Sequence, residues 1–234
     1  MKRKLITIVS IALMSTIFIS CEEDNEITPT AFCDAYIKVT NIADKTQYAL
    51  YGYVYSNVAL QSASFETPAE ETINLSAHNN NSYVFSNYAN DEELYGDAIP
   101  TKGEYSFTVT TKDNKIIERT DVLSEEIATI PVITKSIISD SDVTAEWTET
   151  INADYYIVRL LDKDNKEIFT TDFISKSTLK QTIEKDTYGW FDGKSLSDAV
   201  KLKIMAIKFE DSDSPSTYDV QSIAEIVKEL ETAE

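Results

Sequence analysis

The chain has 234 residues, of which 42% are hydrophobic, and a formal net charge of −19 at pH 7. This apolar content is enough to build packed cores and excludes a disordered tail. The acidic balance excludes a nucleic-acid partner, because affinity for phosphate backbones depends on Lys and Arg. A chain of this length predicts one large domain or two small ones.

The first 25 residues carry the clearest signal in the sequence. Lys2–Lys4 is basic, and Leu5–Ile19 is apolar apart from small hydroxyl residues. This order is typical of a secretory signal. The apolar run is shorter than the ~20 residues that a membrane-spanning helix needs. Ser20–Cys21 follows, and an acidic run begins directly behind it.

A small residue followed by Cys at this place resembles the signal of bacterial lipoproteins. The resemblance implies that residues 1–20 are removed, that Cys21 carries lipid, and that residues 21–31 form an acidic tether. It implies a lipid anchor in the outer membrane as the membrane partner, and the acidic run resembles the export tag of lipoproteins that face the exterior. Two alternatives stay open, namely an ordinary secreted protein and an acidic run that is only a solvated spacer.

Removal of residues 1–20 takes away three positive charges and no negative ones, so the net charge changes from −19 to −22. Anionic lipid surfaces repel such a chain, so the tether must do the anchoring. If Cys21 carries lipid, Cys33 is the one remaining cysteine, and no disulfide framework is expected. Cys33 lies in an apolar stretch, and we expect a small buried side chain there.

Alternating β-branched and aromatic residues predict half-buried strands from residue 36 onward. Residues 104–120 predict a hairpin that turns at Lys112–Lys115, where Asp and Asn tolerate a positive φ. The stretch Lys102–Val109 resembles the end of an immunoglobulin-type or polycystic-kidney-type domain. That resemblance implies an immunoglobulin-like β-sandwich over residues 32–127.

A second series of strands begins near residue 128. Trp147 in the second strand, Tyr156 and Val158 in the third, and Leu202, Ile204 and Ala206 in the sixth resemble the pattern of a fibronectin type III domain. The resemblance implies a second β-sandwich over residues 128–234. Leu202 stands where that family usually has Tyr, so the hydroxyl of a tyrosine corner is missing there. The expected fold class is therefore all-β, with two tandem β-sandwich domains after a lipoprotein signal peptide.

Two local patterns have more than one interpretation. Lys163–Lys166 repeats the tetrapeptide Lys112–Lys115, which would fit a duplicated domain but is too short to establish one. In the tail, Ser222 and Glu225 have the spacing of a capping box, and the apolar residues recur at helical spacing. The sandwich nevertheless needs a last strand in this region, and we expect that strand.

No motif in the sequence indicates catalysis. The single histidine, His78, lies in a polar Asn-rich stretch and is expected in an exposed loop without a nucleophile partner. No cluster has zinc spacing, and no Gly-rich phosphate loop is present. Asp140/Asp142 and Asp211/Asp213 could meet Ca²⁺ in loops, but without a full ligand set we expect solvated turns. No metal, no cofactor and no enzymatic activity are expected.

Two aromatic groups are candidates for ligand binding. Tyr188, Trp190, Phe191 and Asp192 lie in one loop, where flat rings could stack on sugars and the carboxylate could bind hydroxyls. The alternative is that Trp190 caps the end of the sandwich core. Tyr51, Tyr53 and Tyr55 share one face of a predicted strand, and the alternatives there are a domain interface or packing beneath a long loop.

Together these observations predict a surface-exposed binding or scaffolding module, which could take glycans in a polysaccharide-uptake system or contact another cell-surface protein. An adhesin or structural stalk is the alternative function, and a carbohydrate-active enzyme is a weaker one. The glycan and adhesion hypotheses differ in the class of ligand, and the enzyme hypothesis differs in kind.

Overall fold

The computed structural model describes residues 27–88, 93–210 and 219–233. The signal segment, Cys21 and the Asp211/Asp213 pair lie outside these ranges. The regular secondary structure of the described residues is almost entirely β-strand, as the sequence predicts. Within the described ranges, no helix has the length and hydrophobicity needed to cross a membrane.

The first half of the molecule is a sandwich of seven strands. In chain order these are β1 (Ala31–Ile42), β2 (Lys45–Ser56), β3 (Leu60–Glu66), β4 (Thr72–His78), β5 (Asn81–Ser86), β6 (Gly103–Thr111) and β7 (Ile116–Leu123). The order β1-β2-β5-β4 faces β3-β6-β7, and β3 also pairs with β4, which joins the two sheets at one edge. This strand order matches that of immunoglobulin constant-type domains.

The core of this half is aromatic. Phe65, Tyr105 and Phe107 are buried together, with the ring centroids of Phe65 and Phe107 5.1 Å apart. Gly52 lies on the inner face of β2, where an added Cβ would come within 2.2 Å of the Phe65 ring. The Tyr105 hydroxyl donates to the carbonyl oxygen of Thr101, four residues upstream. That hydrogen bond is the tyrosine corner of immunoglobulin-like sandwiches.

The second half is a sandwich of two four-strand sheets. Its strands are β8 (Ile133–Ile138), β9 (Asp142–Trp147), β10 (Tyr155–Leu161), β11 (Glu167–Thr170), β12 (Ile174–Ser175), β13 (Lys180–Glu184), β14 (Lys201–Phe209), β15 (Val220–Glu229) and β16 (Glu231–Thr232). The order β11-β10-β14-β15 faces β13-β9-β8-β16. Trp147 is buried with its ring 5.4 Å from Tyr156, so both residues lie in the core, where the family resemblance implies them.

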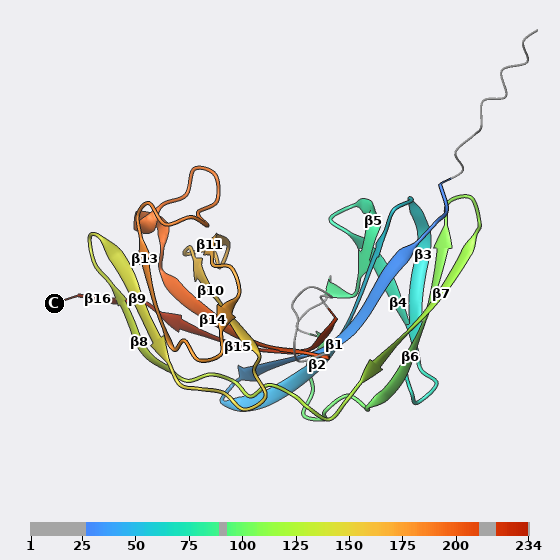
Figure 1. The fold of residues 1–234 in the computed structure, drawn as a ribbon, viewed down its shortest axis with the longest axis horizontal. Helices are drawn as coiled ribbons and strands as arrows, with labels where there is room; N and C mark the ends of the chain where they lie inside the picture. Colours follow the sequence, from blue (N-terminus) through green and yellow to red (C-terminus); the bar gives the residue numbers. More distant parts are fainter. Residues whose placement is uncertain (1–26, 89–92, 211–218, 234) are drawn as a thin grey trace, which may run out of the picture.

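The two halves share one continuous sheet. β15 pairs antiparallel with β14 on one side and parallel with β1 on the other, through Ile37–Val39 and Ser222–Ala224. Figure 1 shows β1, β2 and β15 crossing between the two sandwiches. The expectation that the tail is a strand is therefore confirmed. Its apolar spacing is not alternating, and its burial pattern is not either, because adjacent residues are buried in the first part of the strand.

Candidate functional site

The aromatic loop, residues 185–194, connects β13 to the short 3₁₀ turn η2 (Leu196–Asp198) before β14. Its backbone is fixed to the neighbouring strand, because Thr170 N donates to Gly189 O at 3.1 Å and Phe191 N donates to Ile168 O at 3.0 Å. Gly189 has φ +124°, and a Cβ there would lie 2.2 Å from the carbonyl oxygen of Thr170. Only glycine allows this approach. The loop is therefore held in one conformation by the sandwich.

Trp190 attaches the aromatic loop to the core. Its ring lies 5.0 Å from that of Phe169, and its Nε1 donates to the carbonyl oxygen of Glu184 at 3.2 Å. The side chain is half-buried and packs against the core cluster. In this position part of the ring packs against the core of the protein.

The side chains on either side of Trp190 are exposed. Tyr188 is 90% exposed and Phe191 42% exposed. Asp192 is exposed beside them and has no ion-pair or hydrogen-bond partner among the described side chains. The loop therefore presents two exposed aromatic rings to the solvent.

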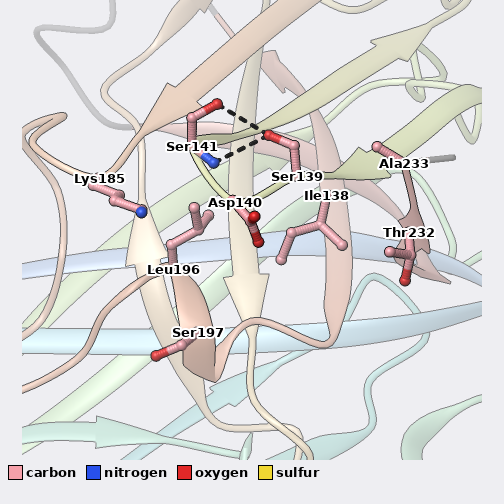
Figure 2. Close-up of a pocket in the computed structure, with 9 residues that line it drawn as sticks. All are labelled: Ile138, Ser139, Asp140, Ser141, Lys185, Leu196, Ser197, Thr232 and Ala233. Carbon is pink, nitrogen blue, oxygen red and sulfur yellow. Dashed lines mark hydrogen bonds between the residues drawn. The ribbon is translucent and has the colours of Figure 1, made fainter.

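An open cleft of about 1010 Å³ adjoins the two ends of the aromatic loop (Figure 2). Lys185 enters it from the start of the loop, and Leu196 and Ser197 enter from its end. The opposite wall is the turn between β8 and β9, which contributes Ser139, Asp140 and Ser141. Ser139 Oγ is held by Ser141 Oγ at 3.1 Å, as the dashed lines in Figure 2 show. The cleft combines hydroxyl groups, one acid and one base over an apolar floor.

The structure separates the three tyrosines of β2. Tyr51 is only 3% exposed, with its ring 5.5 Å from Tyr36 and 4.9 Å from Tyr88. Tyr53 is half-buried near Tyr88, and Tyr55 is 52% exposed. Tyr88 belongs to the segment that follows β5, so packing beneath a loop accounts for Tyr51. The three rings do not form one exposed platform.

His78, Ser86 and Cys33 are fully or partly buried. His78 ends β4 rather than lying in an exposed loop, and its Nδ1 is 3.3 Å from Ser86 Oγ. Ser86 is buried, so no substrate reaches its hydroxyl. Burial raises the pKa of the Cys33 thiol to about 12, which keeps it protonated and unreactive. The sequence predicts a buried Cys33 side chain; in the structure it is partly buried and packs against the core cluster.

Three carboxylates, those of Asp34, Asp121 and Glu210, meet where the two halves join. The sequence analysis missed both this cluster and the cleft. The three acids lie on segments far apart in the chain, and the cleft walls come from two separate loops, so no local spacing could have indicated either one. The lone signal was the acidic stretch that begins at Glu210.

The sequence matches no known protein family and no curated protein. One solved structure that it resembles is the two-fibronectin type III segment of chicken tenascin, at 10% identity over 84% of this chain and 99% of that one, with a TM-score of 0.29. Another is the BSP domain of a biofilm-associated protein, at 13% identity over 86% of this chain and 29% of that one, with a TM-score of 0.25.

A third is SGBP-B of the mixed-linkage glucan utilization locus of Bacteroides ovatus, solved with a mixed-linkage heptasaccharide. It is 11% identical over 88% of this chain and 60% of that one, with a TM-score of 0.19. All three TM-scores are below 0.5, so these structures decide neither the detailed fold nor the function of this chain. The assignment to the all-β sandwich class follows from the strands themselves.

Proposed function

We propose that this protein is a non-catalytic binding module with an immunoglobulin-like and a fibronectin type III-like domain. Lipid on Cys21 anchors it to the outer membrane, and it faces the cell exterior. The signal followed by Ser20–Cys21 and an acidic run supports the anchor and its location. The buried Ser86 hydroxyl beside His78 and the protonated Cys33 thiol support a role without catalysis.

The ligand class that fits best is a glycan. One observation carries this proposal: Tyr188 and Phe191 present exposed rings on a loop that hydrogen bonds and Trp190 hold in place, beside a hydroxyl-lined cleft. Aromatic faces pack on the apolar faces of sugar rings, and a fixed loop loses little conformational entropy on binding. The carboxylate of Asp192 and the polar groups of the cleft are placed to take sugar hydroxyls.

The adhesin or stalk function is supported by a different observation. The parallel pairing of β1 with β15 joins the two sandwiches into one sheet, which resists bending better than a flexible linker. A stalk uses this stiffness and needs no ligand at the aromatic loop.

A glycan array followed by calorimetry on the hit distinguishes these functions. Tyr188→Ala and Phe191→Ala should each weaken binding at least tenfold and change the free energy of unfolding by less than about 0.5 kcal/mol, as is usual for surface substitutions. Trp190→Ala should lower the melting temperature, because its ring and its Nε1 hydrogen bond support the loop. Tyr55→Ala, an exposed tyrosine on the other sandwich, is the matched control. No hit on the array, or equal binding by all four variants, rejects the glycan proposal.

The anchor has its own test. Cys21→Ser should leave an uncut precursor that no longer incorporates a fatty-acid analogue and no longer fractionates with outer-membrane lipid. Cys33→Ser, at the other cysteine of the chain, should label like the parent protein. Labelling of the Cys21→Ser protein would show that the lipid is attached elsewhere or that the signal is an ordinary one.

A further inference from the structure

The junction of the two sandwiches lies where β1 changes its neighbour. The first part of β1 lies beside β7, and the part from Ile37 to Val39 pairs with β15. Asp34 lies at this branch point. Here carboxylates replace backbone carbonyls as hydrogen-bond acceptors. Asp121 Oδ2 accepts from Ala35 N at 2.6 Å, and Asp34 Oδ1 accepts from Val220 N at 3.3 Å.

Three acids converge at this junction from three different segments. Asp34 is in β1, Asp121 is in β7, and Glu210 directly follows β14. One oxygen of each lies within 4.8 Å of the other two. An opening of about 370 Å³, lined by Asp121, Glu210 and Asp219 among others, leads from the surface to the cluster.

The cluster contains carboxylate oxygens that no described group satisfies. Asp34 is 5% exposed, and the bond from Val220 N is the single hydrogen bond that its side chain accepts among the described residues, so its Oδ2 has no donor. Glu210 Oε1 is fully enclosed and also has no donor. Buried carboxylate oxygens without a donor or a counter-charge are costly, and natural proteins seldom retain them without a function.

No described basic side chain neutralises these charges. Arg119, on β7, donates instead to the carbonyl oxygens of Ala31 and Glu118. Lys208, two residues before Glu210, pairs with Glu126 at 3.1 Å and Asp154 at 3.4 Å. The cluster therefore lacks a positive partner.

We propose that Asp34, Asp121 and Glu210 form a Ca²⁺ site that ties β1, β7 and the end of β14 together at the junction. Carboxylate oxygens are the ligands that hard divalent cations prefer. One oxygen of each acid lies within 4.8 Å of the other two, so a single ion can contact all three. Ca²⁺ accepts flexible sets of oxygen ligands, whereas Mg²⁺ demands near-ideal octahedral geometry and usually keeps several waters. Asp219 lines the entrance. This site does not depend on the proposed glycan function.

The full chain, purified in detergent, is tested by thermal unfolding in EDTA, CaCl₂ or MgCl₂ and by calorimetry with CaCl₂. We expect a Kd between about 10⁻⁴ and 10⁻³ M, which is usual for extracellular modules. At 5 mM CaCl₂ and a Kd of about 5 × 10⁻⁴ M, the folding equilibrium constant should rise about tenfold over that in EDTA. MgCl₂ at the same concentration should have a much smaller effect.

Two isosteric variants identify the site. Glu210→Gln and Asp34→Asn should each remove the Ca²⁺-dependent rise in melting temperature, and if Asp34→Asn does not fold, Glu210→Gln decides. Asp140→Asn, an exposed acid in the β8–β9 turn, is the matched control and should keep the full rise. An unchanged rise in Glu210→Gln would mean diffuse binding to an acidic surface and would overturn the proposal. The proposal would also be overturned if CaCl₂ did not raise the melting temperature of the parent protein and Glu210→Gln was more stable than the parent. Bound protons, and not Ca²⁺, would then neutralise the cluster.

Discussion

One tyrosine of β2 in the first sandwich and one of the 185–194 loop in the second end in opposite environments. Tyr51 is buried against Tyr36 and Tyr88, whereas Tyr188 is almost fully exposed. The residue types are the same, and the difference is the cover: the segment after β5 folds back over the face of β2, and no described segment covers the tip of the 185–194 loop. Aromatic sequence alone therefore does not distinguish a core from a binding surface.

The largest effect should come from the core of the second sandwich. Trp147→Ala removes a buried ring in contact with Tyr156 and should lower the free energy of unfolding by about 3–5 kcal/mol. That is a large share of the stability of a small domain. Chemical denaturation followed by fluorescence and circular dichroism measures the loss. A change within about 0.5 kcal/mol would place Trp147 at the surface and shift the register of β9.

The next largest loss of stability should come from the shared sheet. Glu225 on β15 forms ion pairs with Lys203 on β14 at 2.8 Å and with Lys38 on β1 at 3.2 Å, and so connects the two halves. Burial raises the pKa of Glu225. Lys203 and Lys38 lower this pKa by more than burial raises it, so the pKa lies below its usual value. A carboxyl with a lowered pKa contributes stability above its unfolded-state pKa and loses it as the pH falls through the folded-state value.

Glu225→Gln should therefore cost about 3 kcal/mol at pH 7, at the lower end for breaking a buried ion pair. The stability difference from the parent protein should shrink as the pH falls below about 4.5, near the usual pKa of Glu. Denaturation curves between pH 7 and pH 3 measure it. A difference that stays constant over this range would mean that the cost is one of packing and not of charge.

The smallest change in stability should come from the hydroxyl groups of Tyr36 and Tyr51. The Tyr36 hydroxyl is 2.7 Å from that of Tyr88, whereas the Tyr51 hydroxyl is buried without a partner. Tyr36→Phe should cost about 1 kcal/mol, because it leaves one hydrogen bond unmade. Tyr51→Phe should be neutral or stabilising, because it removes an unsatisfied polar group. Equal losses in the two variants would show that the Tyr51 hydroxyl has a partner in solution.

The repeated tetrapeptide shows what local sequence can predict and what it cannot. Lys112–Lys115 and Lys163–Lys166 form the same turn, with Asn114 and Asn165 at φ 61° and 60° and matching closing hydrogen bonds from Thr111 N and Asp162 N. The first turn joins β6 to β7 and the second joins β10 to β11, so they occupy different hairpins of their sandwiches. Shared turn chemistry explains the repeat, and it gives no support for a duplicated domain.

Sequence alone determined the all-β class, most of the strands and the turns, which follow from alternation and turn chemistry acting over a few neighbouring residues. The fibronectin type III resemblance implied the buried Trp147. Only the tertiary structure decided that β15 pairs with β1, that Tyr51 is covered while Tyr188 is not, and that Asp34, Asp121 and Glu210 meet. Pairing and burial between segments far apart in the chain depend on how whole sheets pack, and such packing leaves no mark on any one stretch of sequence.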